Sequence, residues 1–158
     1  MKKLVLGVAL LGALVSCQKW ENKPTEEKIL GIWNGINFQS DLQAAPFFDT
    51  TVVESTSDMV ANFLPEGGLT IDSAGARIDS MGWRIKNDTI LVLDGVNFGL
   101  FEDLPGAPSN LGTSAGFRIV NLTEDLLTFR YDTTMSITVP GVPIPLTVST
   151  GIAQRWER

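Results

Sequence analysis

The sequence contains no histidine, a single cysteine and a single tyrosine. Without histidine, the chain lacks the usual general base at neutral pH and the most common nitrogen ligand of zinc. It has no glycine motif of a phosphate-binding loop, and no serine lies in a Gly-x-Ser-x-Gly turn. With one cysteine, an internal disulfide is excluded. We therefore expect no enzyme activity, no metal and no cofactor, and a fold stabilised by packing.

Positive charge is also scarce, with 12 Lys and Arg against 18 Asp and Glu and a formal net charge of −6. The positive residues of the body occur singly. Such a chain repels phosphate groups, so nucleic acid and anionic headgroups are not expected partners. Paired acids, such as Asp72 with Asp79 or Glu102 with Asp103, could still serve a hydrolase or hold calcium. Their turn positions favour ordinary solvated acids instead.

The N-terminus carries the one long apolar run. Lys2 and Lys3 precede an uninterrupted apolar stretch of twelve residues from Leu4 to Val15. A membrane-spanning helix needs about 20 residues, so the pattern predicts a cleaved export signal over 1–16. The small residue before Cys17 makes this site resemble the lipobox of bacterial lipoproteins. In that family the signal is cut before the cysteine, which is then acylated.

This resemblance implies a lipidated Cys17, carrying palmitate-type chains, that anchors the protein in a membrane. Gln18 at the next position resembles lipoproteins sent to the outer membrane, on its periplasmic or its exterior face. The alternative is an ordinary secretory signal with a chance cysteine near its end. Residues 17–28 would then form a polar tether, and residues 29–158 a single domain.

From Ile29 onward, extended segments alternate with turn signals roughly every ten residues, which is typical of a barrel or a sandwich. The alternation is clearest where Trp83 and Ile85 face one way and Arg84 and Lys86 the other. Two connections are expected to break the pattern, 40–49 and the Gly/Pro-rich 102–115. The predicted strands are 29–39, 50–55, 58–64, 68–72, 76–86, 89–94, 96–101, 116–122, 126–132, 134–139 and 145–156.

The first predicted strand begins with Gly31-Ile32-Trp33, and a Gly-x-Trp at this place resembles the lipocalin and broader calycin pattern. The likeness covers roughly residues 28–158 and is closest to lipocalin-like domains of small bacterial lipoproteins. It implies an all-β fold with a single up-and-down antiparallel barrel. It also implies that Gly31 lets the chain approach closely at the closed end and that Trp33 plugs that end. A basic residue of the last strand, Arg155 or alternatively Arg158, would lie across Trp33.

A barrel of about eight strands can just hold one small molecule or be filled by its own side chains. The resemblance makes 40–49 a lid over the open end, where Phe47 and Phe48 either offer an apolar wall or pack into the rim. We expect non-catalytic binding of a small hydrophobic ligand. The candidate wall residues are Phe38, Phe47, Phe48, Phe63, Trp83, Phe117 and Phe129.

A rival interpretation is an envelope interaction or structural accessory protein with a filled barrel and an envelope protein as its partner. It would act through loops and the uncharged, proline-rich hairpin tip at 139–145. An apolar cavity would favour ligand binding, whereas a solid core with an exposed apolar patch would favour the interaction protein.

Overall fold

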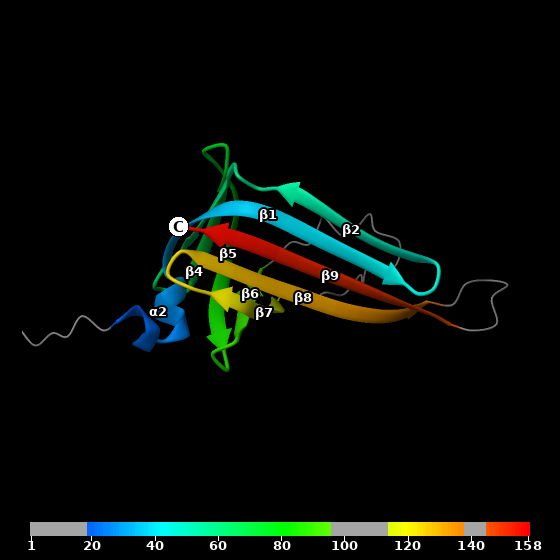
Figure 1. Cartoon of the computed structure of the whole chain (residues 1–158). Coiled ribbons are helices and arrows are strands. Elements are labelled where there is room, and N and C mark those ends of the chain that lie inside the picture. Colours follow the sequence, from blue (N-terminus) through cyan, green and yellow to red (C-terminus); the bar gives the residue numbers. More distant parts are fainter. Residues whose placement is uncertain (1–18, 96–113, 138–144) are drawn as a thin grey trace, which may run out of the picture.

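A computed structural model describes residues 19–95, 114–137 and 145–158 (Figure 1). These residues form two short helices and nine strands. The elements are η2 (Trp20–Asn22), α2 (Thr25–Ile29), β1 (Gly31–Ala44), β2 (Phe48–Ser55), β3 (Met59–Phe63), β4 (Gly68–Ser73), β5 (Ala76–Lys86), β6 (Ile90–Asp94), β7 (Ser114–Leu122), β8 (Leu126–Ile137) and β9 (Leu146–Glu157).

All strands belong to one antiparallel sheet in the order β2-β1-β3-β4-β5-β6-β7-β8-β9, and the additional pairing of β1 with β9 closes it. β2 and β3 share one edge of β1, because β3 pairs with Gly31–Asn34 and β2 with Asn37–Ala44. The barrel therefore has eight strand positions around its circumference, one of them filled by two shorter strands in line. The predicted all-β, single up-and-down barrel is confirmed.

Gly35 allows the change from β3 to β2 along the edge of β1. A Cβ at this position would overlap the main-chain oxygen of Thr56, which lies in the link between the two strands. The amide of Thr56 donates to the Ile36 carbonyl at 3.3 Å. The register of β1 against β9 shifts at the same point, between Gly35 and Asn37. The missing side chain thus lets the two segments approach closely where the ladder changes partners.

Four strands run on beyond the barrel and form a sheet of their own, which Figure 1 shows pointing away from α2. β7 pairs with β8 only as far as Arg130, while β8 continues to pair with β9 up to Ile137. We call this sheet, in the order β2-β1-β9-β8, the four-stranded extension; it comprises residues 37–44, 48–55, 130–137 and 146–155. Among the described strands, β2 and β8 have no further neighbour there, so both are edges.

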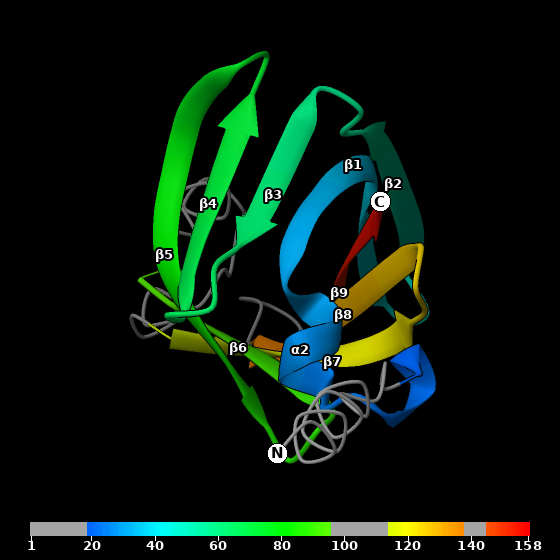
Figure 2. The ribbon, with the colours of Figure 1, turned by 90° about the vertical axis from the view of Figure 1, so that its left-hand side faces the viewer.

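The core fills the end of the barrel across which α2 lies (Figure 2). Ile29 and Trp33 are fully buried. The indole Nε1 of Trp33 donates to the Ile29 carbonyl at 2.7 Å, so α2 and the first strand are joined at the plug. The buried cluster consists of Ile29, Trp33, Ala61, Phe63, Leu69, Met81, Trp83, Leu91, Leu93, Ala115, Phe117, Leu127, Phe129 and Trp156.

Two roles inferred from the Gly-x-Trp resemblance need correction. The residue over the Trp33 ring is Arg158, whose Cζ lies 4.3 Å from the ring centroid, and not Arg155. Arg155 lies one residue before the buried Trp156, so the alternation of β9 turns it outward to solvent. At Gly31, an added Cβ would meet no atom within 4 Å. Glycine is required there because φ is +108°, a conformation unfavourable for other residues.

The predicted connection at 40–49 is also wrong as a lid. Residues up to Ala44 belong to β1, residues from Phe48 belong to β2, and the two strands pair directly across a tight turn. Polar Asp41 and Gln43 alternate there with Ser40 and Leu42, a strand-like period of two that the prediction overlooked. Cys17, the signal over 1–16, the strand at 96–101, most of 102–115 and nearly all of the 139–145 tip lie outside the described residues.

Candidate functional site

Four of the seven predicted wall residues, Phe63, Trp83, Phe117 and Phe129, belong to the buried hydrophobic cluster. Phe63 and Trp83 meet edge to face with their ring centroids 5.3 Å apart, and Phe117 and Phe129 do so at 5.4 Å. The indole Nε1 of Trp83 donates to the Leu64 carbonyl at 3.1 Å, which fixes this ring further. Both pairs therefore have the edge-to-face geometry that aromatic rings favour when they pack against one another.

The other three wall residues lie in the β1–β2 hairpin. Phe47 is in the turn with 69% of its surface exposed, and Phe48 opens β2 with 42% exposed. Phe38 is half-buried in β1, where it pairs with Gln154 of β9. The structure therefore separates the seven aromatic candidates into a core group and a hairpin group.

The inner face of the four-stranded extension continues the barrel interior with apolar side chains that lie between polar ones, among them Ser40, Thr50, Glu54 and Thr150. Ala44, Val148 and Ile152 are buried there, yet they lie outside the core cluster formed by the described residues. Phe48 and Val52 extend the same face onto the edge strand β2, where Val52 is 48% exposed. We call this set the inner apolar layer; its members are Phe38, Leu42, Ala44, Phe48, Val52, Tyr131, Val148 and Ile152.

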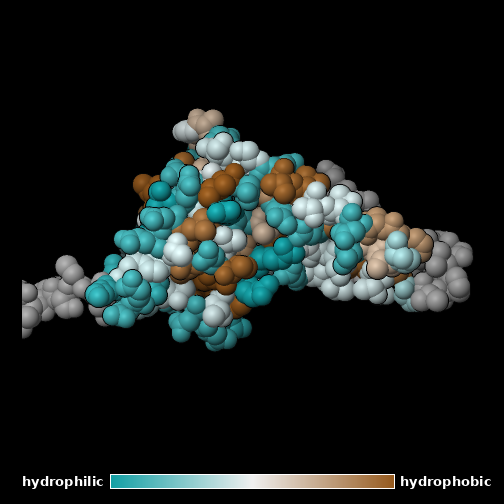
Figure 3. Space-filling model, in the orientation of Figure 1, coloured by the Kyte–Doolittle hydropathy of each residue, from teal (hydrophilic) through white to brown (hydrophobic). Residues whose placement is uncertain are grey.

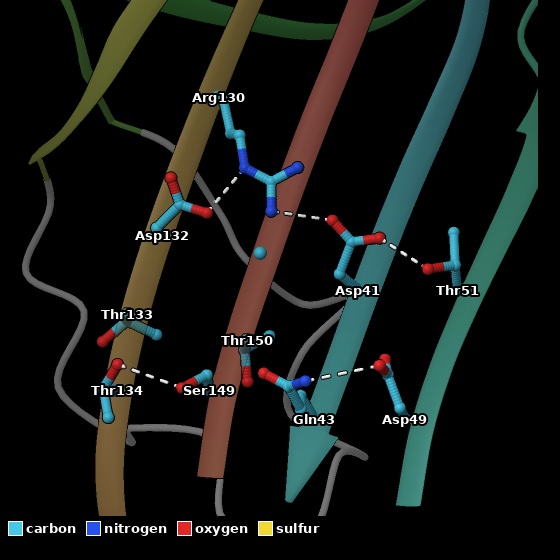
Figure 4. A pocket seen from close by; sticks show the side chains of 11 residues that line it. Asp41, Gln43, Asp49, Thr51, Arg130, Asp132, Thr133, Thr134, Ser149 and Thr150 are labelled. Carbon is cyan, nitrogen blue, oxygen red and sulfur yellow. Dashed lines mark hydrogen bonds and ion pairs between the residues drawn. The ribbon is translucent and has the colours of Figure 1, made fainter.

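The outer face of the same four strands is polar and contains a pocket of about 330 Å³ (Figure 4). Figure 3 shows the middle of this face in hydrophilic and neutral colours, with hydrophobic colours near the β2 edge and toward the far end of the extension. The strand registers place its side chains in rows. One row runs Thr51, Asp41, Gly151, Asp132, and the next runs Asp49, Gln43, Ser149, Thr134.

A charged network closes one end of this outer-face pocket. From β8, the Arg130 guanidinium reaches across β9 to Asp41 at 2.7 Å, while its Nε donates to Asp132 at 2.6 Å. A Cβ at Gly151 would overlap the Arg130 guanidinium, so only glycine leaves room for this crossing. The Thr51 hydroxyl donates to the same Asp41 carboxylate at 2.9 Å. The network thus joins β2, β1 and β8 across β9.

The electrostatics of the network favour the charged forms of its members. A hydrogen bond from the Gln39 amide, with further ones from Thr51 and Arg130, lowers the pKa of Asp41 below 3.8 despite partial desolvation. The hydrogen bond to Asp132, followed by that to Asp41, raises the pKa of Arg130 above its usual value despite partial desolvation. At neutral pH the bridge is therefore a guanidinium held between two carboxylates.

The other end of the pocket is neutral apart from one acid. The Gln43 amide donates to Asp49 at 3.3 Å on one side, and the hydroxyls of Thr134 and Ser149 lie 3.3 Å apart on the other. Figure 4 shows these two pairs side by side, Thr134 and Ser149 on β8 and β9, and Gln43 and Asp49 on β1 and β2. Within the described part of the chain, Asp49 has no cationic partner.

Of the acidic pairs considered for catalysis, Asp72 and Asp79 are described, and each has its own partner. Asp72 is bound by the Arg77 guanidinium at 2.5 Å, and Asp79 accepts from the Ser80 amide at 2.7 Å. Glu102 and Asp103 lie outside the described residues. Residues 19–95, 114–137 and 145–158 contain no group of three or more acidic, His or Cys side chains that could hold a metal. The predicted lack of enzyme activity stays a prediction.

The outer-face pocket was not predicted, although part of its signal is in the sequence. Asp41 with Gln43 and Asp49 with Thr51 show a polar period of two on either side of a proline turn. Arg130 with Asp132 repeats this period much later in the chain. What the sequence does not show is the register that places residue 41 opposite residue 151.

The eight-stranded, up-and-down closed barrel is the architecture of the lipocalins. The fold is lipocalin-like. No family model and no curated protein matches the sequence. Among solved structures, it is similar to a lipocalin-like protein from Bacteroides uniformis, with a TM-score of 0.46 and 14% identity, covering 83% of this chain and 98% of that one. Within the described residues, no helix has the length and apolar character to cross a membrane.

Proposed function

We propose that the protein is a non-catalytic binding protein that holds a small hydrophobic ligand on the inner apolar layer of the four-stranded extension. The observation that carries the proposal is that this layer lies on the inward face but outside the filled core cluster. The packed end near α2 provides a rigid support. At the rim of the layer, Phe48 and Val52 are partly exposed and provide the apolar surface that a ligand would contact first.

The proposal also includes the location of the protein in the cell. The charged and then apolar N-terminus and the small residue before Cys17 support export and lipidation at Cys17. A lipid-anchored protein of the cell envelope, in the outer membrane, would hold its barrel next to a source of hydrophobic molecules. The barrel begins soon after Cys17, since α2 starts at Thr25, whose hydroxyl donates to the Asp88 carbonyl at 3.1 Å.

Two adjacent valines of β2 provide a matched test. Val52 pairs with Ser40 on the inner face, and Val53 pairs with Gln39 on the outer face. Their exposed fractions are similar, 48% and 57%. Val52→Asp places a charge on the inner apolar layer, whereas Val53→Asp places the same charge on the opposite face of the same strand.

We expect native mass spectrometry of the purified protein, incubated with a bacterial lipid extract, to detect a bound hydrophobic molecule at a one-to-one ratio. Val52→Asp should abolish this adduct, and Val53→Asp should retain it. Absence of any adduct in the unchanged protein, or equal loss in both variants, would contradict ligand binding on the inner layer.

An envelope interaction protein is the second candidate, and a specific observation favours it. β2 is exposed along its whole length and is an edge of the sheet, with Phe48, Val52 and Val53 among its exposed apolar residues. An extended segment of a partner could add to such an edge. In that case both valine variants would weaken capture of the partner, since an added strand contacts side chains on both faces.

A further inference from the structure

The outer-face pocket is built on strands and not on loops, which gives its groups fixed positions. Its lining comes from four neighbouring strands whose pairing is continuous through the site. The Arg130 guanidinium is held by Asp41 and Asp132 at 2.7 and 2.6 Å, so its orientation is set before any ligand arrives. Groups that are held in place in this way lose little freedom on binding.

The composition of the lining excludes two classes of ligand. Its side chains are carboxylate, guanidinium, amide and hydroxyl groups, with no aromatic or large aliphatic residue, so a hydrophobic molecule finds no partner. Three carboxylates, those of Asp41, Asp49 and Asp132, line the pocket with the Arg130 guanidinium, and Arg118 pairs with Asp132 from outside the lining at 3.6 Å. One negative charge remains in excess, that of Asp49, and it disfavours phosphate, sulfate and carboxylate groups.

A cationic ligand is disfavoured because the protein already supplies the cation. The guanidinium of Arg130 lies between two carboxylates, in the position that a bound amine would take. Only Asp49 lacks a cationic partner among the described residues, and it accepts from the Gln43 amide.

The groups that remain are paired donors and acceptors. Gln43 with Asp49 on one side and Thr134 with Ser149 on the other can each both donate and accept hydrogen bonds. Ligand hydroxyl groups also do both. We propose that this pocket binds a neutral polyhydroxylated ligand, a sugar unit in chemical class, on the face opposite the inner apolar layer.

The size of the pocket agrees with such a ligand. Its volume of about 330 Å³ is at the lower end of the range of small-molecule sites, which begins at about 300 Å³. The pocket is open toward solvent, as its polar, partly exposed lining indicates, so a terminal sugar of a longer glycan could also enter. Because it lies on the outer face, this site does not depend on the function proposed above.

The test is an NMR titration of the purified, isotope-labelled protein, preceded by a screen on a glycan array. The NMR probes are neutral methyl glycosides, chosen from array hits where there are any, with glucuronate and spermidine as charged comparisons. We expect a neutral sugar to produce saturable shifts of the Gly151, Ser149 and Thr51 amide signals. Glucuronate and spermidine should produce none.

Two acids of β2 give the matched variants. Asp49 lines the pocket, while Glu54 belongs to the same strand, is also exposed and pairs with Phe38 on the opposite face. Asp49→Ala should weaken sugar binding about tenfold, the effect of losing one hydrogen bond to a charged group. Glu54→Ala removes the same charge and should leave the affinity unchanged.

Three results would overturn the proposal. The first is the absence of any neutral glycan binding on the array and in the titration. The second is an equal effect of both variants, which would indicate a general charge effect. The third is spermidine binding that Asp49→Ala abolishes while sugars do not bind, which would make the pocket a cation site.

Discussion

At the scale of single residues, Gly151 determines whether the charged network can form. It sits on β9 between Asp41 and Asp132, and the Arg130 side chain crosses directly over it. A methyl group in this place must displace the guanidinium or push the strands apart. The charged network, and not the backbone of β9, therefore requires a residue without a side chain at position 151.

We predict that Gly151→Ala lowers the free energy of unfolding by about 1–3 kcal/mol, as overpacking usually does. The cost should shrink in an Arg130→Ala background, because the displaced group is then gone. Urea unfolding of the two single variants and the double variant measures this coupling. Ser149→Ala, on the same strand and face, is the control and should change stability little. Additive costs in the double variant would refute the explanation.

A second residue-scale prediction concerns the end of the chain. The Arg158 guanidinium lies over the Trp33 ring and donates to the Lys28 and Leu30 carbonyls at 2.7 and 2.8 Å. Arg158→Ala should therefore lower the free energy of unfolding by about 1–3 kcal/mol. Arg155→Ala, at an exposed arginine three residues earlier, in β9, should change it by less than about 0.5 kcal/mol. Thermal unfolding measures the stability of both variants. An equal loss of stability in the two would contradict the assignment of the contact with Trp33 to Arg158.

At the scale of elements, most strands could be predicted because each alternates visibly. The hairpin of β5 and β6 was recognised from Trp83 to Leu93, and its bounds agree with the prediction to within a residue. The hairpin of β1 and β2 was missed, since its proline and two adjacent phenylalanines suggested a loop. Yet Asp41 and Gln43 continue the alternation up to Ala44. The turn-forming residues led to the prediction of a loop, although the two-residue alternation of a strand was present in the sequence.

The candidate sites could be predicted only in part, because they depend on how the strands pack and pair with one another. Aromatic residues mark a barrel interior, but the sequence does not say whether they pack against one another or line a space. Phe63 and Trp83 proved to be partners in the core. The outer-face pocket needs Asp41 beside Gly151 and Asp132, which depends on how the two ends of the chain pair. Such long-range register has no local signal.

At the scale of the whole molecule, the two faces of the four-stranded extension have opposite chemistry. The inner apolar layer and the outer-face pocket are on the same strands, so one small sheet could hold a hydrophobic and a polar ligand at once. This arrangement needs a fixed orientation to the surroundings. An anchor close to the barrel would supply it.

The predicted anchor can be tested directly. We expect the unchanged protein to incorporate labelled palmitate and to remain with the membrane fraction when expressed in a bacterium that processes lipoproteins. Cys17→Ser should lose both properties, because stable attachment requires the acyl chains. Circular dichroism of the variant should still report the barrel, since Cys17 precedes all of its strands. Membrane retention of Cys17→Ser would contradict lipidation.

The pairing of β1 with β9 also sets the order in which the chain can fold. The barrel closes only when its first strand meets its last, and Arg158 then bonds to Lys28, 130 positions earlier. Contacts at such separation form slowly, because a long loop must be ordered before they contribute. A chain that emerges N-terminus first from a ribosome or a membrane channel can pair β1 with β2 and β3 early, but the other edge of β1 stays unpaired until the residues of β9 appear. During that interval the Trp33 ring lacks the Arg158 guanidinium that lies over it in the closed barrel, and a chaperone can contact it.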